Sequence, residues 1–304
     1  MPTPAHPNAR PKIALFGNLP PQVPTAVAQR SDLILLSEVT PEDAAQITLG
    51  LTSAMNGASK QMLDALPRLE KIVSCGAGLD RFDFAEIERR GIAFHHTGHL
   101  MTQDTAEMAV ALVFALLRRV VTNDTHVRSG AWAERRADPS TRLSGKRVGI
   151  VGLGKIGRSI AQMLSGLGMT ISYTGPNAKP DVTWAYQPDL RLLAGEVDIL
   201  ILACSGGPAT RHLVNAPVLG ALGADGFLVN VARGSVVDEP ALINALETGG
   251  IAGAGLDVFE AEPTPDPRFA RLEHVVLQPH CATLTRENRA ELVTEVLGVL
   301  GLSG

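Results

Sequence analysis

A glycine-rich turn near the middle of the chain most narrows the folds that are open to it. Residues 148–157 read Val-Gly-Ile-Val-Gly-Leu-Gly-Lys-Ile-Gly, an apolar strand that enters a Gly-x-Gly-x-x-Gly turn and then a helical pattern. Gly152 permits the tight bend, Gly154 lets a pyrophosphate approach the backbone, and Gly157 lets helix and strand pack closely. The N-terminus of the helix supplies N–H donors to the phosphates. The turn therefore predicts a nucleotide site, and about 150 residues before it suffice for another domain.

Strand-like and helix-like segments alternate on both sides of this turn. Before it, short buried strands are predicted at Ile13–Phe16, Ile47–Leu51, Lys71–Ser74 and Ile92–Phe94, with helical patterns at Lys60–Leu66 and Phe84–Arg90. From the turn onward, strands are predicted at Arg147–Val151, Thr170–Tyr173, Asp198–Ala203, Gly226–Asn230, Gly253–Leu256 and His274–Gln278. Six strands complete a dinucleotide-binding sheet. Repeated alternation of this kind predicts parallel sheets that are covered by helices.

Two longer helical patterns complete the predicted α/β organisation. Thr105–Arg119 is apolar nearly all round, so it should be buried between layers or at a subunit contact. Thr285–Leu300 lies beyond the second sheet and is expected to pack back on the first domain. We therefore expect two Rossmann-like domains with parallel sheets. A dinucleotide-binding domain, residues 99–283, is inserted into a discontinuous, flavodoxin-like substrate-binding domain, residues 12–98 plus 284–304.

Composition excludes several other classes of protein. With 45% hydrophobic and 19% charged residues, the chain suits a soluble globular protein, and a formal net charge of −4 offers no basic field to nucleic acid. The longest apolar run, Ala109–Leu117, is too short to span a membrane. Cys75, Cys204 and Cys281 form no CxxC pair, so we expect no disulfide or metal site, and a cytoplasmic location. Residues 1–11 are proline-rich and read as a loose tail rather than a signal peptide.

Candidate catalytic side chains follow three strands of the second series. Arg233 comes shortly after the strand that ends at Asn230, Glu262 follows the strand that ends at Leu256, and His280 follows the next strand. Ligands in open α/β sheets bind beyond the carboxyl ends of the strands. One cation, a group of carboxylates and one imidazole therefore converge on a single edge of the predicted sheet.

Hydride transfer to a 2-oxo acid is the chemistry that suits these groups. Arg233 can hold the carboxylate and keto oxygens in a bidentate fork, His280 can protonate the developing alkoxide, and Glu262 can favour the imidazolium form. Taken one at a time, Arg233 also fits an exposed loop arginine and His280 a polar loop residue. Glu262, like Glu260 beside it, also fits a solvated surface charge.

Three segments of the second half resemble signatures of the D-isomer-specific 2-hydroxyacid dehydrogenase family. They are 230–239, Asn-Val-Ala-Arg-Gly-Ser-Val-Val-Asp-Glu; 255–263, Gly-Leu-Asp-Val-Phe-Glu-Ala-Glu-Pro; and Pro279-His280. The resemblance covers essentially the whole chain after the tail. It implies that Arg233, Glu262 and His280 are the catalytic residues and that Asp257 helps to seat the nicotinamide amide.

The resemblance also implies roles outside these three segments. In the loop at 73–80, backbone N–H groups of Ala77 and Gly78 would hold the substrate carboxylate together with Arg233. The other expected cofactor contacts are Thr105, Gly152, Gly154, Lys155, Ile156, Gly175, Asn177, Cys204 and Val231. Residues 99–130 resemble the segment through which these proteins form two-fold dimers, so we expect a homodimer with residues 99–143 as its dimerisation segment and Trp132 as an interface or core anchor.

The residues after the second strand bear on the choice between NAD and NADP. An acidic residue about 20 positions past the glycine turn normally binds the ribose hydroxyls of NAD. Gly175 occupies that position, and no carboxylate precedes Asp181. An arginine at position 176 would select the 2′-phosphate, but Pro176 stands there, and only Asn177 and Lys179 are left to substitute. We therefore expect NADP(H) to be preferred, with NAD(H) possible.

The substrate is less defined than the reaction. Residues 172–175 and 210–213 resemble the glyoxylate/hydroxypyruvate reductase branch of the family, which implies reduction of a small 2-oxo acid to the D-2-hydroxy acid. Another 2-oxo acid, formate or phosphite are alternatives within the same fold. A nucleotide-sensing scaffold, such as a corepressor, is an alternative of a different class. Cys281 stands where an aliphatic residue is usual in the family, and neither it nor Cys75 receives a role from the sequence.

Overall fold

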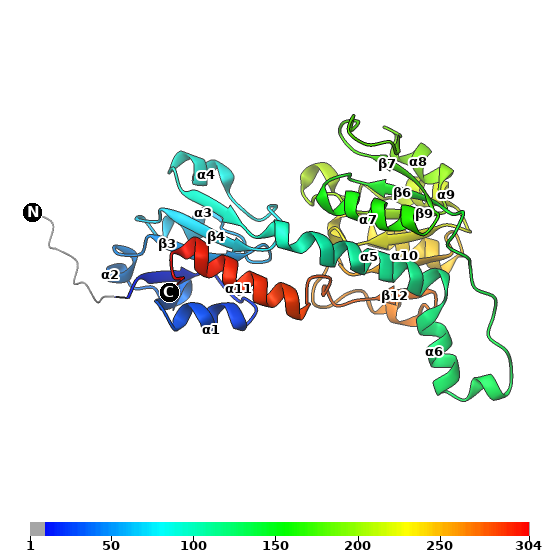
Figure 1. Cartoon of the computed structure of the whole chain (residues 1–304), viewed down its shortest axis with the longest axis horizontal. Helices are drawn as coiled ribbons and strands as arrows, with labels where there is room; N and C mark the ends of the chain where they lie inside the picture. Colours follow the sequence, from blue (N-terminus) through cyan, green and yellow to red (C-terminus); the bar gives the residue numbers. More distant parts are fainter. Residues whose placement is uncertain (1–9, 304) are drawn as a thin grey trace, which may run out of the picture. The chain divides into compact units, whose positions relative to one another are not determined.

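A computed structural model of the chain describes residues 10–303 (Figure 1). The chain divides into two compact units. The first ends at Met101 and resumes at Leu284, and the second is continuous from Thr102 to Thr283. The predicted tail, residues 1–11, lies outside the described residues except for Arg10 and Pro11. Of these two residues, Pro11 is joined to the folded unit, because its carbonyl accepts a hydrogen bond from the Asp32 N–H.

The first unit is built on a five-stranded parallel sheet in the order β2-β1-β3-β4-β5. Its strands are β1 (Lys12–Leu15), β2 (Asp32–Leu35), β3 (Leu49–Ser53), β4 (Lys71–Cys75) and β5 (Ala93–His96). Its helices are α1 (Gln22–Ala28), α2 (Pro41–Ala44), α3 (Lys60–Asp64), α4 (Phe84–Arg89) and α11 (Arg286–Leu300). This strand order is the flavodoxin-like one, as expected. Strand β2 was not predicted, because it is an edge strand whose four side chains all stay partly or fully exposed and no buried apolar pattern marks it.

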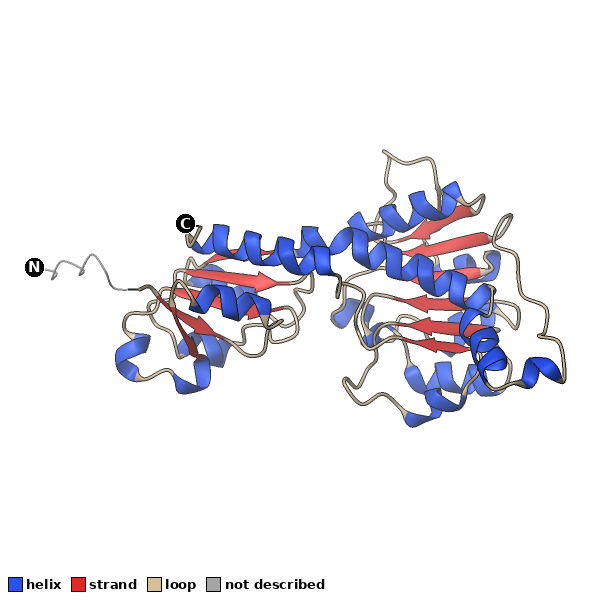
Figure 2. Cartoon of the chain, turned by 60° about the horizontal axis from the view of Figure 1, so that its bottom comes forward, coloured by secondary structure: helices blue, strands red, loops and turns tan. Residues whose placement is uncertain are grey.

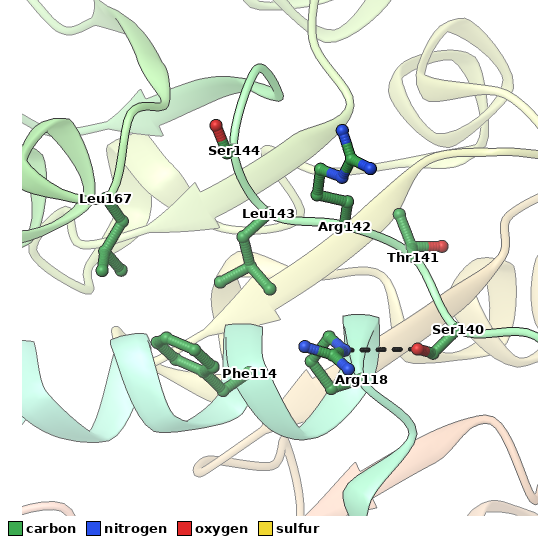
Figure 3. Close-up of a pocket in the computed structure, with 8 residues that line it drawn as sticks. All are labelled: Phe114, Arg118, Ser140, Thr141, Arg142, Leu143, Ser144 and Leu167. Carbon is green, nitrogen blue, oxygen red and sulfur yellow. Dashed lines mark hydrogen bonds between the residues drawn. The ribbon is translucent and has the colours of Figure 1, made fainter.

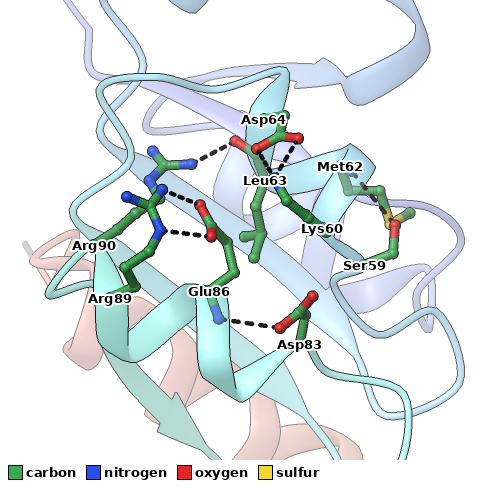
Figure 4. A network of polar contacts seen from close by, with 9 residues as sticks. All are labelled: Ser59, Lys60, Met62, Leu63, Asp64, Asp83, Glu86, Arg89 and Arg90. Atoms are coloured by element: carbon green, nitrogen blue, oxygen red, sulfur yellow. Dashed lines mark hydrogen bonds and ion pairs between the residues drawn. The ribbon is translucent and has the colours of Figure 1, made fainter.

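Local polar contacts fix the two short helices α3 and α4 on this sheet (Figure 4). Ser59 and Asp83 cap their N-termini by accepting hydrogen bonds from backbone N–H groups three residues on. The Arg90 guanidinium, at the end of α4, donates to the carbonyl oxygens of Leu63 and Leu66 at the end of α3. Such caps satisfy N–H groups that a helix cannot pair internally. Two short helices thereby become a single cover for the apolar side chains beneath them.

The second unit contains a seven-stranded parallel sheet in the order β12-β11-β10-β9-β6-β7-β8. Its strands are β6 (Arg147–Val151), β7 (Thr170–Thr174), β8 (Ala185–Tyr186), β9 (Ile199–Leu202), β10 (Phe227–Asn230), β11 (Gly253–Leu256) and β12 (Val275–Leu277). Its longer helices are α5 (Thr102–Leu117), α6 (Val120–Arg128), α7 (Lys155–Gly166), α8 (Leu190–Glu196), α9 (Ala216–Leu222) and α10 (Glu239–Glu247). The expectation of two parallel sheets in an α/β fold is confirmed, and Figure 2 shows the helices around each sheet. The expected count of six strands is wrong, because the two-residue edge strand β8 is too short to leave a periodic signal.

Helix α5 is the central helix of the second unit. It buries seven side chains, and it packs on β10, β11 and β12. Gly255 of β11 allows this close approach, because a Cβ there would lie 3.1 Å from Leu112 and Leu116. Among the described helices, the segment Gly98–Leu117 is long and apolar enough by length and composition to cross a membrane, a test that buried core helices also pass. The helix that was predicted to continue to Arg119 ends at Leu117. Arg119 has φ 52° and is the N-cap of the next helix, α6.

Candidate active site

The turn between β6 and α7 has the geometry that its three glycines predict. Gly152 has φ 94°, and a Cβ there would lie 2.7 Å from the Cα of Cys204. A Cβ on Gly157 would collide with the carbonyl oxygen of Gly152. Around Gly154, in contrast, nothing lies within 4 Å of the Cβ position, so the backbone is open on that side. Two glycines are thus required by close packing, and the third leaves room for a ligand.

The first turn of α7 carries donors that suit a pyrophosphate. Gly154 is the N-cap and makes no side-chain cap. The first N–H group of the helix that makes a backbone hydrogen bond is that of Arg158, which donates to the Gly154 carbonyl. The N–H groups of Lys155, Ile156 and Gly157 have no acceptor among the described residues. Free N–H groups at a helix N-terminus are the usual anion-binding arrangement in dinucleotide sites. The open side of Gly154 and these donors therefore fit the cofactor that the sequence predicts.

No free carboxylate follows β7 directly. Gly175 has open space at its Cβ position, and its carbonyl accepts a hydrogen bond from the Tyr186 hydroxyl. Asp181, the first acidic residue after the strand, is held by Arg158 through contacts of 2.7 and 3.0 Å. The Arg158 guanidinium lowers the pKa of this carboxyl. Asn177, also expected at the cofactor, is exposed.

The remaining predicted cofactor residues of the second unit lie at strand ends or in α5. Cys204 follows β9 and touches Gly152, and burial raises the pKa of its thiol to about 11, so it is neutral at pH 7. Val231 follows β10 and is buried. Thr105 is buried in α5, near its N-terminus.

Arg233 follows β10 in a turn that its neighbours hold firmly. The Asn230 side chain accepts a hydrogen bond from the Ala232 N–H and donates one to the Arg233 carbonyl. A Cβ on Gly234 would collide with the backbone of Phe259, so only glycine lets this turn touch the loop after β11. The Arg-Gly pair therefore places a guanidinium beside the loop that carries Glu262.

Glu262 and His280 form a hydrogen-bonded pair. His280 Nδ1 lies 2.8 Å from Glu262 Oε2, and the Phe259 N–H donates to the other carboxylate oxygen at 2.9 Å. Burial acts to raise the pKa of Glu262, but the hydrogen bond to His280, the Phe259 N–H and the nearby Arg233 outweigh it and lower that pKa. Glu262 therefore stays a carboxylate well into acid, and it orients the imidazole through Nδ1. His280 Nε2 makes no hydrogen bond with the described residues and is available to a ligand.

Asp257 holds the backbone of the histidine loop. Its side chain is 1% exposed, and its two oxygens accept hydrogen bonds from the N–H groups of Cys281 at 2.9 Å and Ala282 at 3.2 Å. His280 has φ 51°, a left-handed conformation that costs energy for a residue with a Cβ. The two hydrogen bonds stabilise this turn. The contact of Asp257 with a nicotinamide amide stays a prediction.

A second carboxylate network, which was not predicted from the sequence, supports the same loops. Buried Glu239, at the start of α10, accepts a hydrogen bond of 2.6 Å from the Glu260 N–H. The Glu260 side chain pairs with Arg211 at 2.8 Å and with His212 at 3.0 Å. All four residues lie within or next to segments that mark the family resemblance, which was the available signal. The pairing of these residues could not be predicted from the sequence, because they come from three separate loops.

The first unit holds the two predicted substrate residues, Ala77 and Gly78, in the loop after β4. Gly76, at φ 118°, turns the chain, and its N–H donates to the Thr97 hydroxyl at 3.0 Å. The N–H groups of Ala77, Gly78 and Leu79 have no acceptor in the described part of the chain. Successive free backbone donors form a small concavity that suits a carboxylate.

A dinucleotide-binding sheet with a histidine–carboxylate pair at its strand ends defines an oxidoreductase that uses a nicotinamide cofactor. Residues 110–282 match the family model for the D-isomer specific 2-hydroxyacid dehydrogenase, NAD binding domain. The chain belongs to this family, whose members are NAD(P)-dependent dehydrogenases and reductases of 2-hydroxy and 2-oxo acids.

Relatives that are named for different substrates match most of the chain. The chain is 46% identical to a 2-ketogluconate reductase of Gluconobacter oxydans, over 81% of this chain and 79% of the relative. It is 40% identical to a hydroxyphenylpyruvate reductase of Plectranthus scutellarioides, over 91% and 86%. The crystal structure of an NADPH-dependent glyoxylate/hydroxypyruvate reductase of Sinorhizobium meliloti, in complex with NADP and malonate, matches with TM-score 0.88 and 34% identity, over 96% and 93%. The chain is thus a 2-oxo acid reductase of this family.

Proposed function

We propose that this protein reduces glyoxylate and hydroxypyruvate to the D-2-hydroxy acid, with NADPH as the preferred cofactor. The observation that carries the proposal is the His280–Glu262 pair in the loop that touches the Arg233 turn. This arrangement offers a proton donor, a group that keeps it charged and oriented, and a cation for the carboxylate and keto oxygens.

The hydrogen bond between Nδ1 of His280 and Glu262 supports Nε2 as the nitrogen that donates the proton. Nδ1 of His280 is engaged by Glu262, so Nε2 is the atom that delivers a proton to the keto oxygen. The Arg233 guanidinium stabilises negative charge that develops on this oxygen. When bound, the nicotinamide supplies the hydride. The histidine leaves the step neutral and is recharged from solvent, which its partly exposed ring permits.

Two features support NADPH over NADH. Gly175 leaves open space where an acidic residue would repel a 2′-phosphate, and Asp181 is neutralised by Arg158. Two cations lie near the end of β7. Arg158 reaches it by pairing with Asp181, and the Lys179 backbone N–H donates a hydrogen bond to the Tyr173 hydroxyl at 2.6 Å. A 2′-phosphate would add a stronger acceptor for the guanidinium than the exposed Asp181 carboxylate.

Steady-state kinetics on a substrate panel test this function. We expect the highest kcat/KM with glyoxylate or hydroxypyruvate and NADPH, lower values with 2-ketogluconate, and the lowest with phenylpyruvate. Arg158→Met should reduce kcat/KM for NADPH about tenfold and leave NADH almost unchanged, because a charge-assisted hydrogen bond contributes about 1.5–3 kcal/mol. The exposed Arg191→Met of α8 is the matched control. A preference of the unaltered protein for NADH would refute the cofactor assignment, and the absence of turnover with every 2-oxo acid would refute the function.

We also propose that two copies pair through residues 99–143. Val120, Val121 and Val127 of α6 are each more than 50% exposed, and Trp132 is 65% exposed. The neighbouring end of α5 borders a cavity of about 430 Å³ in the second unit (Figure 3). Its lining residues are Phe114, Arg118, Ser140, Thr141, Arg142, Leu143, Ser144 and Leu167. Apolar side chains gathered on one exposed segment typically mark a protein interface.

Light scattering during size-exclusion chromatography tests the dimer. The expected mass is twice the 32.1 kDa of one chain. The double substitution Val121→Asp and Val127→Asp should produce the monomer, because it places charges in an apolar interface. Leu192→Asp, at a similarly exposed apolar position on α8, should leave the mass unchanged. A monomeric unaltered protein, or a double variant that keeps the doubled mass, would contradict the proposed interface.

A further inference from the structure

Helix α11 runs antiparallel to β4 in the first unit, so the start of the helix lies by the end of the strand (Figure 1). At one end, Lys71 Nζ, from the first residue of β4, donates to the Val299 carbonyl at 3.1 Å. Further along, Glu295 pairs with His95 at 3.0 Å, and His95 is the register partner of Val73. The step from Val299 to Glu295 in the helix thus covers the same length as the step from Lys71 to Val73 in the strand. This agrees with a rise of about 1.5 Å per helical residue and about 3.3 Å per strand residue.

The same correspondence places Arg289 beside the loop that follows β4. Six more helical residues before Glu295 cover about 9 Å, which matches about three strand residues beyond Val73. Arg289 therefore lies level with Cys75 and Gly76, directly before the free N–H groups of Ala77 and Gly78. The neighbouring Asn288 anchors this turn by donating to the Leu100 carbonyl at 3.0 Å.

The Arg289 guanidinium is a half-buried cation that has no counterion among residues 10–303. It makes no hydrogen bond or ion pair with the described residues. Burial lowers its pKa, and the one opposing effect from the described residues would come from an ionised Cys75 thiol. Burial raises the pKa of that thiol to about 12, so Cys75 is neutral at pH 7 and does not balance the charge.

An unpaired guanidinium in partly desolvated surroundings is costly unless an acceptor arrives. Solvent-exposed arginines avoid this cost by hydration, whereas Arg289 is partly buried near Cys75, the last residue of β4. The donors beside it, the N–H groups of Ala77 and Gly78, already suit one carboxylate. Arg289 is therefore available for a second polar group of the same molecule.

We propose that Arg289 binds the polar group that a 2-oxo acid carries beyond its carboxylate and keto oxygens, a hydroxyl or a second carboxylate. Arg289 is then a specificity-determining residue, and this inference rests on the proposed 2-oxo acid reduction. It favours hydroxypyruvate and hydroxylated or dicarboxylic oxo acids. An aromatic oxo acid would leave the guanidinium desolvated without an acceptor, which is how a polar site rejects an apolar substrate.

The test compares substrates within one variant. Arg289→Met keeps the length and apolar stem of the side chain and removes its donors. We expect kcat/KM for hydroxypyruvate to fall about 10- to 100-fold, since a hydrogen bond to a charged group is lost, and that for glyoxylate to fall less than about threefold. Glyoxylate is the internal control because it has no group beyond the carboxylate and aldehyde. For phenylpyruvate, kcat/KM should rise.

Two further variants separate binding from structure. Arg289→Lys should recover part of the activity with hydroxypyruvate, because it restores a cation at the same place. Arg286→Met, on the exposed side of the same helical turn, should leave every ratio unchanged. Thermal unfolding of each variant checks that the fold is retained. Equal losses with glyoxylate and hydroxypyruvate, or no loss with either, would overturn the role of Arg289. An unaltered protein that reduces no 2-oxo acid would instead overturn the proposed function, so the two failures are distinguishable.

Discussion

Replacing His280 with alanine should reduce kcat for 2-oxo acid reduction about 10²- to 10⁴-fold, the usual contribution of a general acid. We propose the imidazole as the proton donor, and the Glu262 contact at Nδ1 leaves Nε2 without a hydrogen bond to the described residues. Binding of NADPH should persist, because the glycine turn and the first turn of α7 lie at other strand ends. Stopped-flow measurement of the hydride-transfer step, together with fluorescence titration of NADPH, distinguishes the two effects.

The matched control is His274→Ala, an exposed histidine that precedes β12 at the opposite end from His280. This variant should retain the kcat of the unaltered protein. If His280→Ala kept a near-normal kcat, or lost NADPH binding in proportion to activity, His280 would not be the proton donor.

Glu262→Gln should shift the pH dependence of kcat/KM as well as lower its maximum. Reduction needs a protonated imidazole, so the rate is lost as the pH rises. The Glu262 carboxylate lies 2.8 Å from Nδ1 of His280, and the removal of its negative charge should move this descending limb toward acid. Measurement of kcat/KM for glyoxylate across pH 5–9 tests the shift, with Glu273→Gln, near the start of β12, as control.

The lowered pKa of Glu262 sets the window for this comparison. A carboxyl whose pKa is lowered by folding contributes stability above its ordinary pKa, and that contribution is lost as the pH falls through the lowered value. Across pH 5–9 the unaltered protein therefore keeps Glu262 ionised, and the comparison measures the effect of its charge. An unchanged profile in Glu262→Gln would show that the pair does not control the protonation of the imidazole.

Much of the site could be predicted because parallel strands end at one edge of a sheet. Arg233, Glu262 and His280 each follow a strand, and β10, β11 and β12 are neighbours in the sheet. Periodicity also located the strands with long buried runs. It failed for β2 and β8, because an exposed edge strand and a two-residue strand lack the alternation on which such a prediction depends.

Contacts between distant loops could not be predicted in the same way. The collision that forces glycine at position 234 comes from the backbone of Phe259, and the Glu239 carboxylate meets the Glu260 N–H across separate loops. The Asp257 carboxylate likewise accepts hydrogen bonds from the N–H groups of Cys281 and Ala282, 24 and 25 residues further along the chain. Side-chain partners of this kind depend on the packing of segments that are far apart in the chain.

The amino-acid sequence by itself determined the nucleotide turn, the parallel α/β architecture and the three catalytic candidates, because glycine spacing and strand periodicity are local properties. Only the tertiary structure decided that Arg158 pairs with Asp181 and that Arg289, beside the loop after β4, has no counterion in the described part of the chain. The state of a charge depends on the groups that surround it in space. For Arg289 those groups come from strands more than 200 residues earlier in the chain, and the first unit brings them together by packing α11 against β4.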